Sequence, residues 1–293
     1  MKILITGSNG FIGKHLSNEL AKSGHCPIPL KSNLLDQKSL AQELRESEFD
    51  QVVHLAGLSH QLNHKAEDFY FNNVIGSQNL ISGIEQFFKN KKIFIASTGH
   101  VYSNSSLQVS ENHKLQPEGH YATSKLAMEY ICKTSAMTSD VVILRLFNCT
   151  GIGQDNSFFI PKLINSFKKK LPTLKLGNLN VEREFNDIRW VTYVLRSLIE
   201  IDTPTEIFNI CTGKTYNLEV IIKKIENMTG HFPSLEMESK FIRQKERKVL
   251  KGDPSKLYSF LKKHGKFVNF IPLEQTLSLM LSNDYDHLLS SGA

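Results

Sequence analysis

Three evenly spaced glycines near the start of the chain constrain its fold more than any other feature. The apolar run at residues 2–6 leads directly into Gly7, Gly10 and Gly13, and a helix-like segment follows. Glycines at this spacing permit a tight turn and a close approach of the backbone to a ligand, while the helix N-terminus favours a phosphate. A plain glycine-rich turn is the alternative, but the position between strand and helix favours a dinucleotide. The candidate cofactor-binding residues of this loop are Gly7, Asn9, Gly10, Phe11, Ile12 and Gly13.

Short apolar runs alternate with helix-like segments through the first half of the chain. The runs predicted to be strands are 2–6, 26–30, 51–56, 92–97 and 141–147. The segments predicted to be helices are 12–23, 37–47, 72–88 and 121–135. This alternation predicts a Rossmann-type α/β fold with a doubly wound parallel sheet. Pro27 and Pro29 lack N–H donors, so we expect the second strand to be short or irregular.

The rhythm of strands and helices changes after Phe147. Residues 160–170 and 185–200 read as helices, and residues 206–211 read as a strand. We therefore expect a smaller, mixed α/β C-terminal lobe. The predicted division is a dinucleotide-binding domain at 1–148, with returning segments near 185–212, and a lobe that takes up most of 149–293.

Composition and charge narrow the class of protein. The chain has 293 residues, of which 40% are hydrophobic and 22% charged, as in ordinary globular proteins. No stretch approaches the ~20 apolar residues of a membrane-spanning helix, so no membrane partner is expected. The net charge of +6 lies in short lysine groups without interleaved aromatic residues, so no nucleic-acid partner is expected either. Four scattered cysteines without metal-type spacing favour reduced thiols, no bound metal and a cytoplasmic location.

The end of the second predicted strand bears on the type of dinucleotide. An acidic residue there would bind the 2′-hydroxyl of NAD(H). In this chain Leu30 is followed by Lys31 and Ser32, a cation and a hydroxyl that suit a 2′-phosphate. NADP(H) is therefore favoured over NAD(H). The next acidic residue, Asp36, would lie beside the adenine or cap the following helix.

A tyrosine and a lysine, Tyr121 and Lys125, follow the fourth predicted strand, beyond Thr98. A pair at this spacing also occurs on ordinary surface helices. Together, however, the TGSNGFIG, HLAG, IAST and YATSK stretches resemble the extended short-chain dehydrogenase/reductase family, which includes the NAD-dependent epimerases and dehydratases. The resemblance runs over nearly the whole chain. It implies an NAD(P)-dependent oxidoreductase.

This resemblance implies catalytic roles for Thr98, Tyr121 and Lys125. Reduction of a ketone needs a proton at the developing alkoxide, which a tyrosine hydroxyl can give if its pKa of ~10 is lowered. Lys125 would stabilise the phenolate and bind the nicotinamide ribose, and Thr98 would orient the substrate oxygen. Thr98 could instead satisfy backbone groups at the strand end, and Ser97 could share its role.

Further positions match the family's cofactor site. Leu55, Ala56 and Gly57, in HLAG, resemble the stretch that passes beneath the cofactor ribose. Asn73 resembles a family asparagine that secures the backbone near the catalytic strand more readily than it touches the ligand. We count all four among the candidate cofactor-binding residues, with Tyr121 and Lys125.

Two motifs in the second half resemble those of reductases that act on nucleotide-bound 4-keto-6-deoxyhexoses. NCTGIGQDNSFFIPK begins at Asn148, and GNLNVEREFNDIR contains Arg183, whose guanidinium would bind the diphosphate. Arg243 resembles a second diphosphate ligand, although either arginine could form a surface salt bridge instead. Arg189 and Trp190 depart from the family pattern, with an expected effect on inter-lobe contact or substrate fit. The candidate substrate-binding residues are Thr98, His100, Asn148, Phe159, Ile160, Arg183 and Arg243.

The residues after Thr98 disfavour one related activity. The family's 4,6-dehydratases carry an Asp-Glu pair there, whereas this chain has Gly99 and His100. Neither residue reproduces a paired acid and base, so dehydration is disfavoured. His100 could line the sugar pocket or be a solvated loop residue.

The resemblance therefore implies NADPH-dependent reduction of the C4 ketone of a nucleotide-activated 4-keto-6-deoxyhexose, with dTDP as the expected nucleotide, for deoxysugar and surface polysaccharide biosynthesis. A nucleotide-sugar 4-epimerase with tightly bound NAD is the alternative. A cofactor-sensing or scaffold protein is a third candidate, which the retention of Thr98, Tyr121 and Lys125 disfavours. Helices near 72–88 and 121–135 pair two subunits in this family, so a homodimer is expected.

Overall fold

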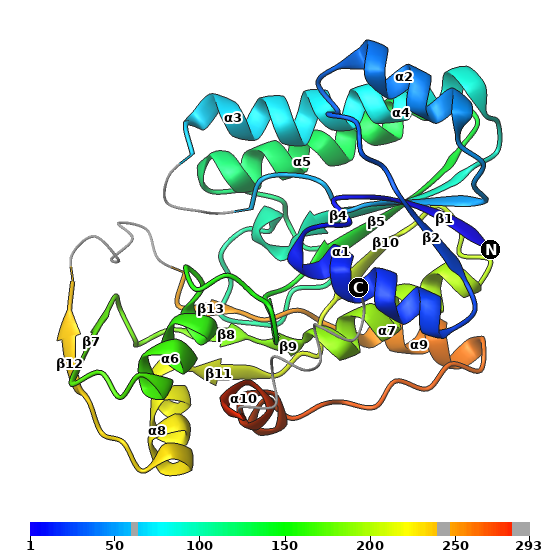
Figure 1. Ribbon diagram of the computed structural model, residues 1–293. Coiled ribbons are helices and arrows are strands. Elements are labelled where there is room, and N and C mark those ends of the chain that lie inside the picture. The colour runs from blue at the N-terminus through cyan, green and yellow to red at the C-terminus, as the bar shows by residue number, and fades with distance from the viewer. Residues whose placement is uncertain (60–63, 239–246, 283–293) are drawn as a thin grey trace.

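The computed structural model describes residues 1–59, 64–238 and 247–282, and a six-stranded sheet lies at its centre (Figure 1). Its strand order is β10-β5-β4-β3-β1-β2, and every neighbouring pair is parallel. The strands are β1 (Lys2–Thr6), β2 (Cys26–Pro29), β3 (Gln51–His54), β4 (Lys92–Thr98), β5 (Asp140–Leu146) and β10 (Ile207–Ile210). The order reverses between β1 and β3, which is the switch point where such sheets bind ligands. The predicted Rossmann-type α/β fold is confirmed.

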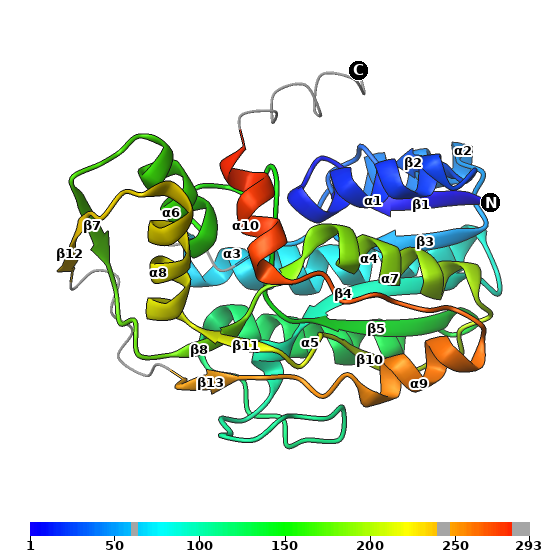
Figure 2. The same ribbon diagram turned by 90° about the horizontal axis from the view of Figure 1, so that it is seen from below.

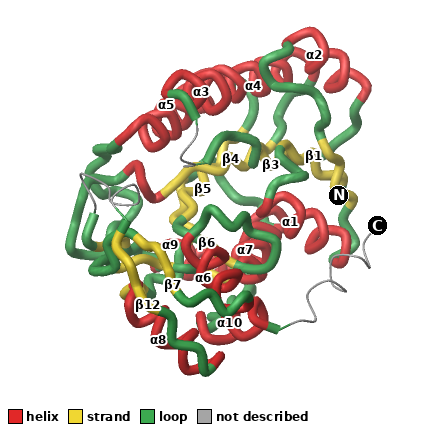
Figure 3. Tube along the Cα trace, turned by 60° about the vertical axis from the view of Figure 1, so that its left-hand side comes forward, coloured by secondary structure: helices red, strands yellow, loops and turns green. Residues whose placement is uncertain are grey.

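Helices cover both faces of this sheet (Figures 1 and 3). On one face lie α2 (Gln37–Glu46), α3 (Ala66–Tyr70), a π-helical turn η1 (Phe71–Ile75), α4 (Gly76–Phe87) and α5 (Gly119–Ser135). On the other lie α1 (Phe11–Lys22), α7 (Ile188–Glu200) and α9 (Ser255–Lys263). Two apolar cores fill the space between the sheet and these two helical layers, one around Leu80 and Met128 and one around Leu16 and Val194. Each fully buried side chain of this kind contributes about 1.5–3 kcal/mol.

The second strand keeps its prolines because it lies at the edge of the sheet. The backbone N–H groups of Cys26 and Leu30 donate to Met1 and Ile5 at 2.8 and 2.9 Å. Successive residues of a strand face opposite ways, so Pro27 and Pro29 direct their missing donors away from β1. β2 is four residues long, as short as expected.

Residues beyond β5 build a smaller lobe beside the carboxyl ends of the sheet strands (Figure 2). Its helices α6 (Phe159–Lys168), α8 (Leu218–Thr229) and α10 (Leu273–Leu281) share one apolar core. Its strands are β6 (Cys149–Thr150), β7 (Thr173–Leu176), β8 (Glu182–Glu184), β9 (Asn186–Asp187), β11 (Thr215–Asn217), β12 (Ser234–Met237) and β13 (Val249–Leu250). They pair as β11-β8-β13, β12-β7 and β6-β9. The division into domains at residue 148 stays a prediction.

Two helices begin three or more residues away from their predicted starts. The helix expected from residue 72 already begins at Ala66 and passes through η1 before α4. The helix expected from residue 185 begins at Ile188, because Asn186 and Asp187 pair with β6 and the Asp187 side chain caps α7. In the described part of the chain, no helix combines the length and apolar character needed to cross a bilayer.

Candidate active site

The glycine loop forms an open cradle between β1 and α1. Gly7 has a φ of 66°, and a Cβ there would lie 2.7 Å from the backbone nitrogen of Ala56. A Cβ on Gly13 would lie 2.1 Å from the carbonyl oxygen of Gly7, so a side chain has no room. No side chain caps α1 after Gly10, so its first N–H groups can bind a phosphate. The cradle, whose turn also contains Asn9, Phe11 and Ile12, thus fits a dinucleotide pyrophosphate.

A cavity of about 240 Å³ lies beside the residues that follow β2 and β3. It is lined by Ser32, Asn33, Leu34, Leu35, Ala56, Gly57, Leu58 and Asn72. Three of these were candidates for cofactor binding, namely Ser32, Ala56 and Gly57. Its place at the switch point suits the adenosine half of a dinucleotide.

The acidic residue after β2 has a structural role. The Oδ1 atom of Asp36 accepts a hydrogen bond of 3.2 Å from the backbone nitrogen of Ser39 and caps α2. Of the two roles expected for Asp36, the structure therefore shows the helix cap.

Asn73 fixes the turn that follows β3. Its Oδ1 accepts a hydrogen bond from the backbone nitrogen of Leu58 at 2.7 Å, and its Nδ2 donates to Ser124 on α5 at 3.0 Å. A Cβ on Gly57, whose φ is 152°, would lie 2.7 Å from Asn73 Oδ1 and 3.1 Å from Lys125 Nζ. These contacts match the role in securing the backbone, and they place Lys125 directly beside the cofactor loop.

Thr98, Tyr121 and Lys125 come together at the carboxyl end of β4. Thr98 is the last residue of β4, and the other two lie one turn apart on α5, which packs against that strand. The Thr98 side chain lies close enough to the Tyr121 hydroxyl to lower its pKa by hydrogen bonding. The Nζ atom of Lys125 donates to the carbonyl oxygen of Ala96 at 2.9 Å. The side chain expected to donate the proton and the one expected to orient the substrate oxygen are thus neighbours.

Burial sets the pKa values of both side chains on α5. It lowers the pKa of Lys125 to about 8. It also raises the pKa of Tyr121, although the hydrogen bond with Thr98 acts in the opposite direction. The lowered tyrosine pKa expected from the sequence is therefore not found. Desolvation of the hydroxyl outweighs its hydrogen bond, and Lys125 directs its ammonium group to Ala96.

The loop after Thr98 lines the same site. The ring of His100 lies 6.3 Å from the ring of Tyr121 between centroids, and Phe69 lies 6.2 Å from it on α3. A Cβ on Gly99 would lie 2.8 Å from the ring of Phe147, so the acidic residue of the dehydratases has no room. This packing agrees with the sequence-based expectation, which disfavours dehydration.

The candidate substrate residues occupy different surroundings. Arg183, on β8, is only 9% exposed, and its Nη1 donates to the carbonyl oxygen of Glu182 at 2.8 Å. Phe159 stacks on Phe185 with ring centroids 6.2 Å apart. The side chain of Ile160 is 1% exposed inside the lobe core, so it packs there.

Two further candidates complete this set. The carbonyl oxygen of Asn148 accepts a hydrogen bond of 2.9 Å from the backbone nitrogen of Asn186, which joins the segments of β6 and β9. Arg243 lies outside the described residues. The roles of all these residues in substrate binding stay predictions.

The two residues that depart from the family pattern lie at the start of α7. Arg189 forms an ion pair of 2.7 Å with Asp187, whose Oδ2 also accepts a hydrogen bond from Thr276 on α10. Trp190 is 2% exposed and packs in the core between α1, α7 and the sheet. Arg189 thus contributes to the junction between the sheet and the lobe.

A buried ion pair behind α5 was not predicted from the sequence. Arg145, on β5, contacts Glu129 on α5 through Nε and Nη2 at 3.0 and 2.7 Å. Ser97 donates to the same carboxylate at 2.5 Å. This network attaches α5 to β4 and β5 one position before Thr98, because Ser97 and Arg145 are partners in the register of the sheet. Two signals could have revealed it, because Arg145 interrupts an apolar run and Glu129 continues the spacing of Tyr121 and Lys125.

A second missed residue is Arg247, which precedes β13 and is 6% exposed. Its Nη2 donates to the carbonyl oxygens of Tyr102 and His100 at 2.6 and 3.3 Å. It therefore holds the loop that follows Thr98 against the segment before β13.

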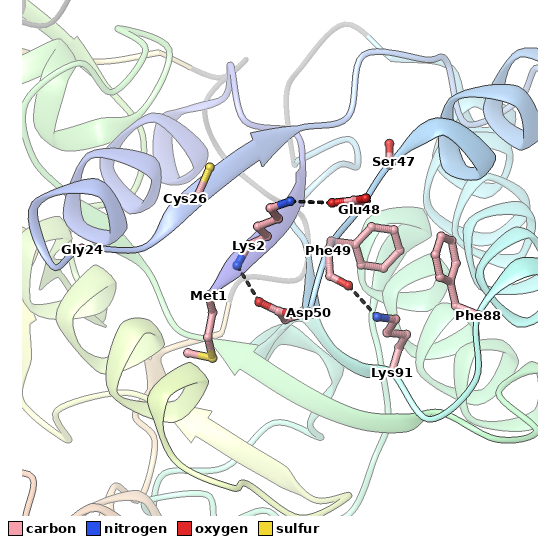
Figure 4. Close-up of a pocket in the computed structure, with 10 residues that line it drawn as sticks. All are labelled: Met1, Lys2, Gly24, Cys26, Ser47, Glu48, Phe49, Asp50, Phe88 and Lys91. Atoms are coloured by element: carbon pink, nitrogen blue, oxygen red, sulfur yellow. Dashed lines mark hydrogen bonds and ion pairs between the residues drawn. The ribbon is translucent and has the colours of Figure 1, made fainter.

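A larger cavity, of about 520 Å³, lies at the opposite end of the sheet (Figure 4). Its polar groups contact one another, with Lys2 bonded to Glu48 at 2.6 Å and to Asp50 at 2.7 Å. Lys91 donates to the carbonyl oxygen of Phe49 at 2.5 Å. These residues lie at the amino ends of β1 and β3, so the cavity belongs to neither the cradle nor the Tyr121 site. No group of three or more His, Cys, Asp or Glu residues suited to a metal ion occurs within residues 1–59, 64–238 and 247–282.

Comparison with known proteins identifies the family of the chain. The pattern of the NAD dependent epimerase/dehydratase family matches residues 3–211. The chain is 31% identical over 290 residues to the GDP-6-deoxy-D-talose 4-dehydrogenase of Aggregatibacter actinomycetemcomitans, covering 97% of this chain and 98% of that protein. It is 27% identical over 274 residues to the GDP-6-deoxy-D-mannose reductase of Pseudomonas aeruginosa, covering 88% and 90%. The structure of RMD from Pseudomonas aeruginosa complexed with NADPH is similar with a TM-score of 0.87 at 25% identity, covering 98% of this chain and 99% of that one.

The chain therefore belongs to the NAD-dependent epimerase/dehydratase family of the short-chain dehydrogenase/reductase superfamily. The family predicted from the sequence is confirmed, and a nicotinamide cofactor is supported.

Proposed function

We propose that the protein reduces the C4 ketone of a nucleotide-activated 4-keto-6-deoxyhexose with NADPH. The observation that carries this proposal is the meeting of Tyr121 and Lys125, one turn apart on α5, with Thr98 at the carboxyl end of β4. In this arrangement Tyr121 gives a proton to the carbonyl oxygen, and Thr98 holds that oxygen in place. The names of two relatives, a 4-dehydrogenase and a reductase of 6-deoxyhexoses, support the reaction type.

The residues proposed to bind the cofactor lie in two places, the glycine cradle and the 240 Å³ cavity. The bound dinucleotide supplies the hydride that reduces the ketone. Gly7, Gly10 and Gly13 leave room for the pyrophosphate, and the N-terminus of α1 binds it. The cation of Lys31, after β2, supports the proposed preference for NADP(H) over NAD(H).

The nucleotide of the substrate is proposed from the relatives. Both carry GDP-linked sugars in their names, which favours GDP over the dTDP expected from the sequence. Arg183 is the residue that we propose for the diphosphate, because its guanidinium is a bidentate donor on the lobe strand β8. Deoxysugar biosynthesis for surface polysaccharides is the proposed context. The cytoplasmic location stays a prediction.

The test of this function is the oxidation of NADPH, followed by absorbance, with GDP-, dTDP- and UDP-linked 4-keto-6-deoxyhexoses. We expect turnover with the GDP-linked sugar and weaker turnover or none with the others. If no sugar nucleotide causes NADPH oxidation at high enzyme concentration, the reductase proposal is wrong.

The second candidate is a sugar-nucleotide 4-epimerase, which uses the same three catalytic side chains. An epimerase retains its NAD between turnovers, so the purified protein would carry bound dinucleotide and would need no added reductant. Mass spectrometry of the denatured protein distinguishes the two candidates. A cofactor-sensing or scaffold protein remains the third reading, which the contact between Tyr121 and Thr98 disfavours.

The pKa of Lys125 predicts how activity depends on pH. Because burial lowers this pKa to about 8, Lys125 loses its charge above that pH, and we expect kcat to fall as pH rises further. In the folded protein Lys125 binds fewer protons than in the unfolded chain between about pH 8 and its usual pKa, so its contribution to stability rises with pH there. Measurement of kcat and of the melting temperature across this range separates loss of the charge from unfolding. A constant kcat up to about pH 10 would contradict the role of Lys125.

We propose that a second copy of the chain packs on the helical face formed by η1, α4 and α5. The apolar side chains of Phe71, Ile75 and Tyr130 on these elements are 54%, 40% and 60% exposed. We expect a dimer by light scattering, and a monomer when Phe71 and Tyr130 are both replaced by lysine. The control Phe232→Lys, at a side chain that is 70% exposed in the lobe, should stay dimeric. A monomeric unmodified protein would rule out this interface.

A further inference from the structure

The backbone after β2 holds an internal anion. The consecutive N–H groups of Lys31 and Ser32 both donate to the carboxylate of Glu43 on α2, at 2.9 and 2.6 Å. Two successive N–H groups that converge on one negative charge form an anion-binding nest. The Ser32 hydroxyl is also occupied, because it bonds to the hydroxyl of Ser39 at 3.0 Å.

This nest lies where the fold recognises the cofactor ribose. Ser32 lines the 240 Å³ cavity together with Ala56 and Gly57, which follow β3. In Rossmann-type folds the residues at the end of the second strand contact the 2′ position of the adenosine ribose. A 2′-phosphate of NADP(H) would therefore approach the donors that Glu43 now occupies.

The negative charge of Glu43 at the nest disfavours the binding of a second anion, such as the 2′-phosphate of NADP(H). A phosphate monoester carries about two negative charges at neutral pH. Although partial burial acts in the other direction, the hydrogen bonds from Ser32 and Lys31 lower the pKa of Glu43, so this carboxylate remains ionised. The ammonium of Lys31 also attracts the Glu43 carboxylate. The negative charge of Glu43 therefore offsets part of the positive charge that Lys31 presents to a phosphate.

We infer that Glu43 is a specificity-determining residue that occupies the 2′-phosphate site and weakens the binding of NADP(H) relative to NAD(H). This inference rests on the nicotinamide cofactor of the proposed function. Lys31 favours the phosphate and Glu43 opposes it, so the preference between the two cofactors is the balance of these residues. Lys31 alone, as read from the sequence, overstates the preference for NADP(H).

The test compares the dissociation constants of NADP⁺ and NAD⁺, measured by calorimetry without any sugar, for Glu43→Gln and Glu43→Ala. Both variants remove the charge, and we expect the ratio of the NAD⁺ to the NADP⁺ constant to rise about tenfold. The constant for NAD⁺ should stay within about twofold. Glu46→Gln is the matched control, because it makes the same charge change one turn later on α2, where Glu46 bonds to Gln42. Adding Lys31→Ala to Glu43→Gln should cancel most of the gain.

A ratio that is unchanged or lower in both variants overturns the inference, as does an equal rise in Glu46→Gln. Because the ratio is used, a general loosening of the loop, which weakens both cofactors alike, counts against the inference. Cofactor binding is measured apart from turnover, so the two proposals fail separately. A shifted ratio without reduction of any sugar nucleotide would leave the inference standing and the reductase proposal wrong.

Discussion

Replacement of Tyr121 by phenylalanine should lower kcat about 10³-fold and leave the dissociation constant of the cofactor nearly unchanged. The substitution removes one hydroxyl, which lies near Thr98 and is the proposed proton donor. The ring stays between Phe69 and His100, so the shape of the site is kept. Single-turnover kinetics with NADPH and the sugar nucleotide measure the chemical step directly.

Tyr130→Phe is the matched control for this experiment. Tyr130 lies on the same helix, is 60% exposed and carries the same hydroxyl. It should retain the kcat of the unmodified protein. Near-normal turnover by Tyr121→Phe would show that the proton comes from another group, and an equal loss in both variants would indicate damage to α5 itself.

The strands of the main sheet could be predicted from the sequence because each one corresponds to a short contiguous segment. Each predicted strand is a short apolar run, and the glycine loop marks the first crossover. Pro27 and Pro29 led us to expect a short or irregular second strand. Because the two prolines are two residues apart, both positions that lack an N–H donor face the open edge of the sheet. The lobe was predicted only in outline. Its strands are two to four residues long and are held by partners far away in the chain.

In the candidate site, too, some residues could be predicted from short motifs and others could not. Gly7, Gly13 and the Tyr121–Lys125 pair follow from short motifs, and the structure places them at one end of the sheet. Glu129 and Arg145 were missed because a buried ion pair joins residues on different elements, and neither residue reveals the other. Glu43 was missed because its carboxylate reaches the N–H groups of Lys31 and Ser32 only in the folded chain, across 12 and 11 residues of sequence.

The buried ion pair also explains how α5 can carry an unpaired charge so near the sheet. Glu129 accepts from both Arg145 and Ser97, so it attaches the helix one turn beyond Lys125. Within the described residues, Lys125 Nζ donates to the carbonyl oxygen of Ala96 and to the sulfur of Met128, and neither partner is a carboxylate. Its ammonium therefore keeps its charge available to the reaction at a cost to folding.

Because the buried charge of Lys125 destabilises the fold, we expect the Lys125→Met variant to be less active and more stable than the unmodified protein. A pKa lowered from 10.5 to about 8 corresponds to about 3 kcal/mol against the charged form at neutral pH. Methionine has a similar length and no charge, and it loses one hydrogen bond to Ala96 worth about 1 kcal/mol. The melting temperature should therefore rise by about 2–5 °C. Loss of the cation beside the reacting oxygen should lower kcat about 10²–10³-fold.

The paired readouts, a thermal melt and a kcat measured on the same preparation, decide what the buried lysine does. Lys223→Met on α8 is the control, since it removes an exposed lysine in the lobe and should change neither quantity. If Lys125→Met melted at a lower temperature, the lysine would be a structural part of α5, and its loss of activity would say nothing about chemistry. A higher melting temperature with lost turnover has one physical reading. The protein retains a desolvated cation that destabilises the fold because the reaction at Tyr121 needs it.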